Sequence, residues 1–283
     1  MLPTSQEDAA WSHIVSNARK EGRLTIYSFN FLGDGGLALG QAFKNRYGID
    51  VDIITGRGAE FIERLKTEQR IGKMLADVVE GSNIHSRNMK LGGLTETLAA
   101  LPVLKEKDIW WTNPTFMDSD AHFLGFTRFY LSPWINTRLV KSSEEPKSWY
   151  DLLQPRWRGK ITVGDPNISN LLYYFVLFVE QKRLEPDFLK KLSTQDIIFS
   201  RGTMDSVEKA ARGDVDLAVL TSGGEGGNLV KEGAPIKAID IKEGVIANLH
   251  AINVVKGAPH PAAGRLFINW ILTDEGQRVW AEA

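Results

Sequence analysis

Cysteine is absent from this chain of 283 residues. Without thiols the protein can form no disulfide bond, and it has neither a thiolate nucleophile nor a cysteine-based zinc site. A chain without cysteine is compatible with an oxidising compartment such as the periplasm.

Long apolar runs and an excess of one charge are also missing. The longest apolar candidate, residues 171–179, is about half of the roughly 20 residues that a membrane-spanning helix needs. Lys and Arg total 34 against 35 Asp and Glu, which leaves a formal charge of -1. This balance gives no general attraction to nucleic acid or to anionic membranes, so we expect any ligand to be recognised by local groups.

A secretory leader is likewise not seen at the start of the chain. Residues 1–22 contain neither a basic segment nor an apolar segment of the signal-peptide type. They instead predict a helix, with Ser5 and Asp8 approximating a capping box and Gly22 suited to the C-terminal cap. We expect a periplasmic protein whose signal peptide is not part of this sequence, although a cytosolic protein would share these features.

From residue 23 onward, short β-branched runs alternate with longer amphipathic ones, which is typical of parallel α/β units. The predicted strands are 24–27, 51–55 and 77–79, then 161–163, 197–199 and 217–220. The predicted helices are 37–47 and 59–71, then 169–181 and 204–212. The architecture is therefore repeated, although the sequence is not.

Two segments are expected to connect the two halves. Residues 125–130 read as an extended crossover, and residues 239–248 as a second one, followed by a strand at 249–255 and a helix at 261–272. The last segment would then return to the first lobe. We predict a first lobe of residues 1–125 plus 247–283 and a second lobe of residues 126–246.

One stretch, SWYDLLQPRWRGKITVGDPNISN at residues 148–170, is the most informative. An aromatic-rich helix is expected to end at Pro155, followed by a basic turn, a strand and a new helix. This order resembles the signature that opens the second lobe of type 2 periplasmic solute-binding proteins, in the iron-type group of ABC-transporter receptors. Residues 20–28, 65–79 and 257–277 resemble three further blocks of that family. The resemblance implies an α/β fold of two lobes, each with a central, mostly parallel sheet flanked by helices, joined by a two-segment hinge.

Ligands of open parallel sheets bind outside the carboxyl ends of the strands, where helix N-termini offer unpaired N–H groups. The candidate ligand-binding residues at such positions and in the first crossover are Ser28, Phe29, Asn30, Arg57, Gly58, Glu80, Ser82, Thr127, Arg128, Asn167, Ser169, Asn170, Ser222, Gly223, Gly224 and Glu225. Most are small, polar or glycine, which lets a ligand approach backbone amides closely.

The two arginines are the candidate sources of positive charge. Arg57 lies between glycines after a strand, so its planar fork could hold a carboxylate or phosphate, and the alternative is a solvated loop arginine. Arg128 could act in the same way or bridge the two crossover segments.

The other candidates each have a structural alternative. Ser169 and Asn170 could donate to an anion, or Ser169 could simply cap a helix. The segment 222–224 could form an anion-binding nest or a flexible turn. Glu80 and Glu225 would repel an anion or attract a cation, unless they cap helices or pair with an arginine. The aromatic residues Phe29, Phe31 and Trp134 could line the cleft, although such side chains are more often core.

No metal site is predicted. The five histidines show no close ligand spacing, and each alone is expected to be structural or exposed. In the ferric-binding branch of the resembled family, an adjacent tyrosine pair follows the strand that corresponds to 217–220. Here that loop reads Thr221-Ser222-Gly223-Gly224, while Tyr173-Tyr174 lies in an apolar helical run where packing is expected. Ferric ion with a synergistic anion is kept as an alternative ligand.

A dinucleotide-dependent enzyme is the alternative from another class. Residues 33–38 satisfy a loose G-x-G-x-x-[GA] pattern. Four residues separate the strand from Gly33, however, and no ribose-binding acid follows the second strand at Thr55-Gly56. Neither a Walker motif nor a G-x-S-x-G elbow is present.

We therefore expect an extracytoplasmic receptor of an ABC importer, not an enzyme, without cofactor. The ligand would be a small polar and anionic solute in the cleft between the lobes, with closure by a hinge. Membrane permease subunits are the expected partners, nucleic acid is not, and a monomer is expected. A solute sensor that partners a membrane receptor would share the same fold.

Overall fold

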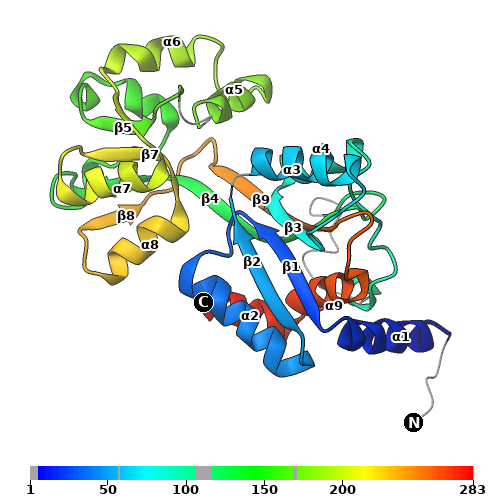
Figure 1. Cartoon of the computed structure of the whole chain (residues 1–283). Helices are drawn as coiled ribbons and strands as arrows, with labels where there is room; N and C mark the ends of the chain where they lie inside the picture. The colour runs from blue at the N-terminus through cyan, green and yellow to red at the C-terminus, as the bar shows by residue number, and fades with distance from the viewer. Residues whose placement is uncertain (1–5, 57, 106–116, 168–170, 283) are drawn as a thin grey trace. The chain divides into compact units, whose positions relative to one another are not determined.

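A computed structural model describes residues 6–56, 58–105, 117–167 and 171–282. The chain divides into two compact units: unit 1 is Met1–Arg128 with Leu249–Ala283, and unit 2 is Phe129–Asn248 (Figure 1). Two strands, β4 (Leu124–Asn136) and β9 (Ile246–Val254), contain residues of both units. Within the described part of the chain, no helix has the length and apolar character that crossing a bilayer requires.

Unit 1 is built from alternating strands and helices. In chain order its remaining elements are α1 (Gln6–Glu21), β1 (Arg23–Ser28), α2 (Gly33–Tyr47), β2 (Asp50–Thr55), α3 (Gly58–Arg70), β3 (Val78–Ser82), α4 (Asn83–Leu91), η1 (Pro102–Lys105), α9 (Pro261–Ile271) and α10 (Asp274–Glu282). The strands run in the order β2-β1-β3-β9, with β1, β2 and β3 parallel and β9 antiparallel to β3.

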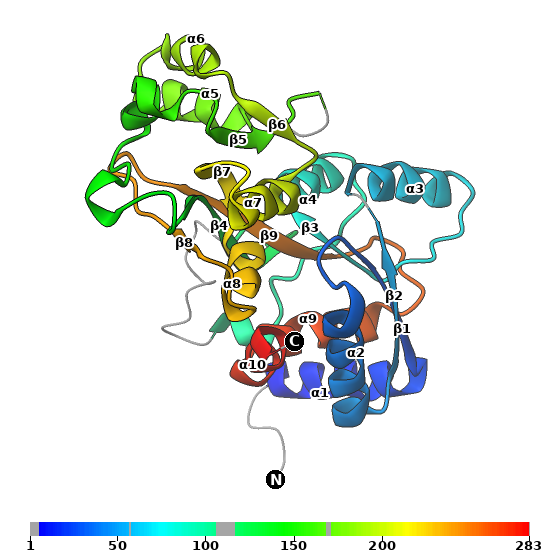
Figure 2. The same cartoon turned by 90° about the vertical axis from the view of Figure 1, so that its left-hand side faces the viewer.

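Helices cover both faces of this sheet. Helices α1, α2, α9 and α10 lie on one face and α3 and α4 on the other (Figure 2). The alternation of β1 explains the two cores: Leu24 and Ile26 point into the first layer with Phe43 and Phe267, and Tyr27 points into the second with Phe61.

Glycines end the helices of unit 1 where the sequence predicts. Gly48 follows α2 with φ 76° and donates its N–H to Lys44 O, and Gly22 and Gly72 also have positive φ. Glycine adopts this left-handed conformation without the steric penalty that a Cβ brings. The predicted strands and helices of this unit agree with the observed ones to within a few residues.

Unit 2 repeats the architecture. Its elements are η3 (Ser142–Glu144), η4 (Trp149–Leu153), η5 (Pro155–Trp157), β5 (Ile161–Gly164), α5 (Tyr173–Glu180), α6 (Phe188–Leu192), η6 (Ser193–Gln195), β6 (Ile198–Ser200), α7 (Thr203–Arg212), β7 (Leu217–Ser222), α8 (Gly223–Lys231) and β8 (Ile236–Ala238). The parallel strands β6, β5 and β7 lie side by side, and β4 joins antiparallel to β7 and to β8.

Two layers of side chains also enclose the sheet of unit 2. One core gathers Trp149, Phe175 and Phe188 from η4, α5 and α6, and the other gathers Trp134 and Val207 beneath α7. The fold class predicted from the sequence, α/β with a mostly parallel sheet in each half, is confirmed.

A bulge interrupts the pairing of β4 with β7. Ser132 faces Thr221 and Trp134 faces Ala218, so the single residue Pro133 opposes two residues of β7. Proline has no N–H to give to the ladder, and bulges are where strands accept it. One of the two opposing residues, Leu220, has φ 53° although it is fully buried, which is a strained conformation for a branched side chain.

Three details differ from the sequence-based expectation. The predicted aromatic-rich helix is a short 3₁₀ helix at 149–153, with Ser148 as its N-cap and Pro155 opening the next turn. The second crossover is β9 itself, which begins at Ile246, so the expected extended segment at 239–248 lies mostly outside the strand. Helix α5 begins at Tyr173, within the predicted range 169–181.

Candidate functional site

The carboxyl ends of β1, β2 and β3 meet at one edge of the unit 1 sheet because the three strands are parallel. The antiparallel strand β9 brings His250 to the same edge, where it pairs with Ser82 at the end of β3. Residues Ser28 to Asn30, Glu80, Ser82 and His250 therefore surround one end of this sheet, which is where open α/β sheets bind their ligands.

Glu80 lies at the centre of this group with its side chain fully buried. Its Oε2 accepts hydrogen bonds from Ser28 Oγ at 2.6 Å, Phe29 N at 3.0 Å and Asn30 N at 2.8 Å. Its Oε1 contacts Asn30 Nδ2 at 3.1 Å and His250 Nδ1 at 2.7 Å, and Asn30 Nδ2 also contacts His250 Nδ1. The predicted alternatives of helix cap or arginine partner are not what is observed, because Glu80 pairs with a histidine.

A second histidine lies beside this cluster. Ser82 is the N-cap of α4, and its Oγ lies 2.8 Å from His85 Nδ1 and accepts from His85 N at 3.4 Å. Burial and, to a smaller extent, the nearby His250 lower the pKa of His85. A histidine with a lowered pKa is neutral over more of the physiological range, so His85 adds hydrogen-bonding capacity here without adding charge.

The three candidate wall aromatics have different environments. Phe31 and Trp134 are core residues at 1% and 5% exposure, and Phe31 packs edge-on against Trp280 at 5.1 Å between ring centroids. Phe29 is 46% exposed and lies 5.6 Å from the His250 ring. Only Phe29 of the three offers an accessible apolar face at the strand ends.

In unit 2 the corresponding edge contains the start of α8. The helix begins directly after β7 with Gly223 and Gly224, and its N-cap residue Ser222 makes no side-chain hydrogen bond to the first turn. A Cβ on Gly223 would have only Tyr130 O as a neighbour, at 3.7 Å, and one on Gly224 only Ser222 Oγ, at 3.9 Å. Packing does not require glycine at either position. The two glycines therefore leave the first N–H groups of the helix accessible.

Glu225 lies in the first turn of α8 but is oriented towards α7. Its carboxyl group interacts with Thr203 at the start of α7, and among the described residues its Oε2 is buried with no hydrogen-bond partner. Burial raises the pKa of the Glu225 carboxyl, while the bond from Thr203 lowers it and Glu208 raises it to smaller extents. The side chain is thus directed into unit 2.

The raised pKa predicts a pH-dependent effect of Glu225 on stability. The folded chain holds this proton to higher pH than the unfolded chain, so the group reduces stability as pH rises from about 4.5 through the folded pKa. We expect Glu225→Gln to raise the melting temperature at pH 7 and to have no effect at pH 4. Thermal denaturation at both pH values measures this, with Glu232→Gln at the exposed far end of α8 as the control for charge. An equal shift at both pH values would contradict it.

The remaining candidates are more scattered. Asn167 is exposed, and its N and Nδ2 both donate to Asp165 Oδ1, at 2.8 Å and 3.0 Å, so this amide is held in a local turn. In β4, Thr127 is half-buried and Arg128 is exposed. Gly58 begins α3. The candidates Arg57, Ser169 and Asn170 lie outside the described residues.

Metal-binding groups are dispersed in the described ranges. Among residues 6–56, 58–105, 117–167 and 171–282, no three His, Cys, Asp or Glu side chains are grouped so that they could hold a metal ion. Tyr173 is exposed, and the hydroxyl of Tyr174 accepts from Asn248 Nδ2 at 3.1 Å, so the adjacent tyrosines do not share one environment.

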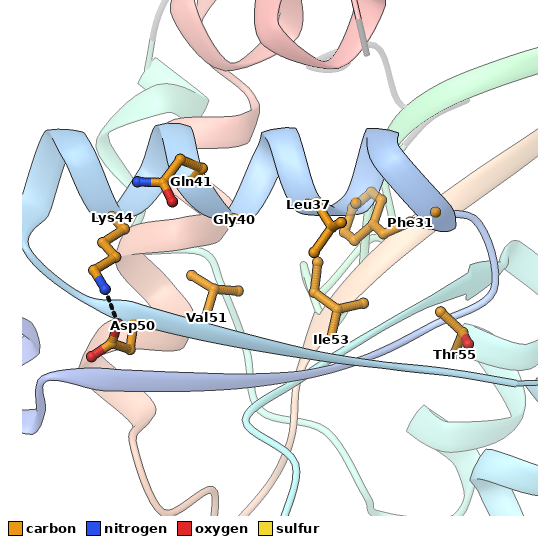
Figure 3. Close-up of a pocket in the computed structure, with 11 residues that line it drawn as sticks. Phe31, Leu37, Gly40, Gln41, Lys44, Asp50, Val51, Ile53 and Thr55 are labelled. Carbon is orange, nitrogen blue, oxygen red and sulfur yellow. Dashed lines mark ion pairs between the residues drawn. The ribbon is translucent and has the colours of Figure 1, made fainter.

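A groove of about 480 Å³ runs between α2 and the edge strand β2 (Figure 3). Its floor includes Val51 and Ile53, and the ion pair of Lys44 with Asp50, at 2.6 Å, closes one end. It exists because α2 carries glycines towards the strand: a Cβ on Gly40 would lie 3.4 Å from Val51 Cβ. Of the candidate ligand-binding and cleft-lining residues that the structure describes, Phe31 lines this groove and the others do not.

Sequence reasoning missed His250, His85 and Thr203 as members of these clusters. His250 had a usable signal, since it is one of two polar residues, with Asn253, in the mostly apolar predicted strand at 249–255, and a buried imidazole needs a polar partner. The identity of that partner depends on the register of β9 against β3, which has no signature in the sequence.

Comparison with known proteins identifies relatives of this chain. A family model described as bacterial extracellular solute-binding protein matches residues 92–283, about two thirds of the chain. A Salmonella typhimurium protein described as "putative 2-aminoethylphosphonate-binding periplasmic protein" is 26% identical and covers 91% of this chain and 76% of its own length. Iron uptake protein A1 of Synechocystis is 25% identical, covering 85% of this chain and 68% of that protein.

Solved structures share the fold. Iron-bound HitA from Pseudomonas aeruginosa superimposes with a TM-score of 0.76 at 21% identity, covering 92% of this chain and 84% of HitA. The periplasmic binding protein AfuA from Actinobacillus pleuropneumoniae, solved with fructose-6-phosphate, gives 0.72 at 22% identity, with coverages of 90% and 81%. At these identities the likeness establishes the architecture alone.

Proposed function

The chain belongs to the family of bacterial extracellular solute-binding proteins, and we propose that its solute is a small phosphorus oxyanion, a phosphonate or phosphate ester. The protein would deliver this solute to the permease of an ABC importer without changing it chemically, on the outer side of the cytoplasmic membrane. Units 1 and 2 would correspond to the two lobes expected at 1–125 with 247–283 and at 126–246.

The start of α8 is the observation that carries this proposal. Ser222 supplies a hydroxyl group without a capping bond, and Gly223 and Gly224 expose N–H groups at the positive end of the helix dipole. The carboxyl group of Glu225, in the first turn of this helix, is directed towards Thr203 at the start of α7. Three oxygens on one phosphorus atom suit such a set of convergent donors.

Ferric ion is the competing ligand, because relatives include an iron-uptake protein. Iron would require hard anionic ligands such as tyrosinate or carboxylate, and the loop that enters α8 carries threonine, serine and glycine instead. The Salmonella relative, whose description names a phosphonate, supports the oxyanion.

Thermal denaturation with a ligand panel tests the proposal. At about 100 times its dissociation constant, a true ligand adds roughly 2.7 kcal/mol to the free energy of unfolding. We expect 2-aminoethylphosphonate, another alkylphosphonate or a sugar phosphate to stabilise the protein and ferric citrate to have no such effect. Stabilisation by ferric citrate alone would replace the proposal with iron binding.

Matched variants locate the site once a ligand stabilises the chain. Gly223→Asp places a carboxylate at the start of α8, where the helix dipole favours it, so folding should be retained while oxyanion affinity falls at least about tenfold. Gly227→Asp, one turn further along the same helix, is the control and should bind like the parent. If Arg57→Ala and Arg128→Ala also bind like the parent, the predicted arginine clamp is wrong. Contact of the solute with both units, and the monomeric state, stay predictions from the sequence.

A further inference from the structure

The end of β1 offers a set of hydrogen-bond donors that point to one place. They are the successive backbone N–H groups of Phe29 and Asn30, the hydroxyl of Ser28 and the amide of Asn30. Consecutive backbone N–H groups that converge in this way form an anion-binding concavity. The carboxyl ends of strands are also where this class of fold binds its ligands.

The anion in this concavity is part of the protein. The carboxyl group of Glu80 receives all of these donors, with distances between 2.6 and 3.1 Å. An ionised carboxylate has acceptors only, and its two oxygens provide enough lone-pair positions for the donors observed. Four donor groups from three consecutive residues therefore depend on one side chain of a neighbouring strand.

His250 completes the arrangement from a third strand. Its Nδ1 lies 2.7 Å from Glu80 Oε1, and the two side chains are 2% and 0% exposed. A carboxylate removed from water needs several hydrogen bonds or a partner of opposite charge, and Glu80 has several hydrogen bonds together with the imidazole beside it. The β3–β9 register, with Ser82 opposite His250, places the imidazole diagonally across from Glu80.

We propose that Glu80 is a positioning residue for solute binding: it serves as a built-in anion that orders the segment 28–31 and closes this end of unit 1 to the anionic group of the solute. The first effect follows from the four donors. The second follows because the N–H groups are occupied and a second anion would meet a buried carboxylate of the same sign. This second effect rests on the proposed function.

The consequence for specificity is a division of roles between the described strand ends. The edge of unit 1 presents Phe29, 46% exposed, with its backbone held from below by Glu80. Among the described residues, Ser28 to Asn30 offer an apolar and neutral hydrogen-bonding surface there, which suits the organic part of an alkylphosphonate or sugar phosphate. The oxyanion would be left to donors such as those at the start of α8.

Chemical rescue in the full chain, without solute, tests the first effect, the ordering of the segment 28–31 by Glu80. In Glu80→Ala the amide protons of Phe29 and Asn30 should exchange with solvent at least about tenfold faster than in the parent, because their acceptor is gone. Acetate or formate at tens of millimolar should restore protection in the variant and leave the parent unchanged. Chloride at equal ionic strength should restore much less, because it cannot accept bonds in the same geometry.

A second buried glutamate provides the matched control. Glu68 is 4% exposed and accepts from Tyr27 Oη at 2.6 Å and from Leu75 N at 3.0 Å. Glu68→Ala should accelerate exchange at Leu75 and leave Phe29 and Asn30 protected. If Glu80→Ala does not fold, Glu80→Gln, which keeps the shape, is measured at the same two amides and should show faster exchange. Parent-like exchange at both amides in the folded Glu80 variant would overturn the proposal.

The second effect, the closing of this end of unit 1 to an anionic group, is measured with inorganic phosphate and 2-aminoethylphosphonate as probes on the parent protein. Added probe should protect amides at the start of α8 and not those of Phe29 and Asn30. Protection confined to Phe29 and Asn30 would overturn the closing role of Glu80. If neither probe changes any amide, the proposed function fails for these probes, while the acetate rescue still decides whether Glu80 is the built-in anion.

Discussion

Replacing Asp77 with alanine should lower the free energy of unfolding by about 3 to 5 kcal/mol, the cost of removing one partner of a buried polar network. Asp77 is fully buried where β3 begins. Its Oδ2 accepts from Thr25 N at 2.7 Å and lies 3.0 Å from His260 Nδ1, and its Oδ1 accepts from His260 N at 2.6 Å. One carboxyl group therefore joins β1, the start of β3 and the N-cap of α9.

The expected loss in the free energy of unfolding is large because Asp77→Ala leaves buried hydrogen-bond donors without an acceptor. Two backbone N–H groups, of Thr25 and His260, lose their acceptor, and each unsatisfied donor in a buried setting costs about 1 to 3 kcal/mol. Asp77→Asn retains the shape and one carbonyl oxygen, so a smaller loss is expected.

Urea denaturation of the two variants measures the difference, and Asp52→Ala is the control. Asp52 forms an exposed ion pair with Arg23 at 3.1 Å, with side-chain exposures of 61% and 58%, and such pairs contribute about 0 to 1 kcal/mol. A loss in Asp77→Ala no larger than that in Asp52→Ala would show that water replaces the missing carboxylate.

Alanine at Gly226 and alanine at Gly227 should change stability in opposite directions, although the two residues are neighbours in α8. A Cβ on Gly226 would lie 2.4 Å from Cζ2 of Trp134, whereas a Cβ on Gly227 would meet nothing within 4 Å. Trp134 is 5% exposed and packed under the helix, so its ring has little freedom to move. Overpacking of this kind costs about 1 to 3 kcal/mol.

At Gly227, helix propensity should make the substitution by alanine stabilising. Alanine favours a helix over glycine by about 0.5 to 1 kcal/mol, and at Gly227 no clash offsets the gain. Chemical denaturation of the two variants gives the comparison directly. A gain in both would mean that Trp134 moves aside, and a loss in both would mean that α8 needs its glycines for another reason. Since α8 carries Ser222 to Gly224 at its start, Gly226→Ala should also weaken oxyanion binding.

Local patterns predicted most of the elements because the forces that end them are local. Gly48 and Gly213 follow α2 and α7 in left-handed conformations, with φ 76° and 84°, and both positions are visible as glycines after amphipathic runs. The strand β5 is buried at all four residues and mostly apolar, as expected of a parallel strand covered on both faces.

Elements set by distant contacts were less predictable. The segment at 149–153 was expected to be helical, but its 3₁₀ type was not predicted: the Trp149 indole donates to Gly244 O at 3.0 Å and Ser148 Oγ to Glu243 Oε1 at 2.7 Å. These bonds to a loop almost a hundred residues away hold a short 3₁₀ turn. Leu220 is a second case, because nothing about a leucine in an apolar strand indicates a positive φ.

The candidate site likewise has features that local sequence patterns predict and features that depend on distant contacts. Strand ends and glycine-rich starts of helices could be found by reading the sequence, which placed Ser28 and Ser222 at the ends of their strands, whereas Glu80, expected after a strand, lies within β3. The partner of Glu80 could not be found, since His250 is 170 positions away and the two meet only in one register of β9. The orientation of Glu225 into unit 2 likewise depends on the packing of α8 against α7.

The passage of β4 and β9 through both units bears on the order in which the protein can fold during its synthesis. Unit 2 is one continuous segment, Phe129–Asn248, and all of its residues precede Leu249, where the chain re-enters unit 1 within β9. Unit 1 has to wait for Leu249–Ala283, because α9 supplies Leu266, Phe267 and Trp270 to its main core. The half of the chain that is translated first is thus the half that is completed last, and until then its sheet exposes an apolar face to which a chaperone could bind.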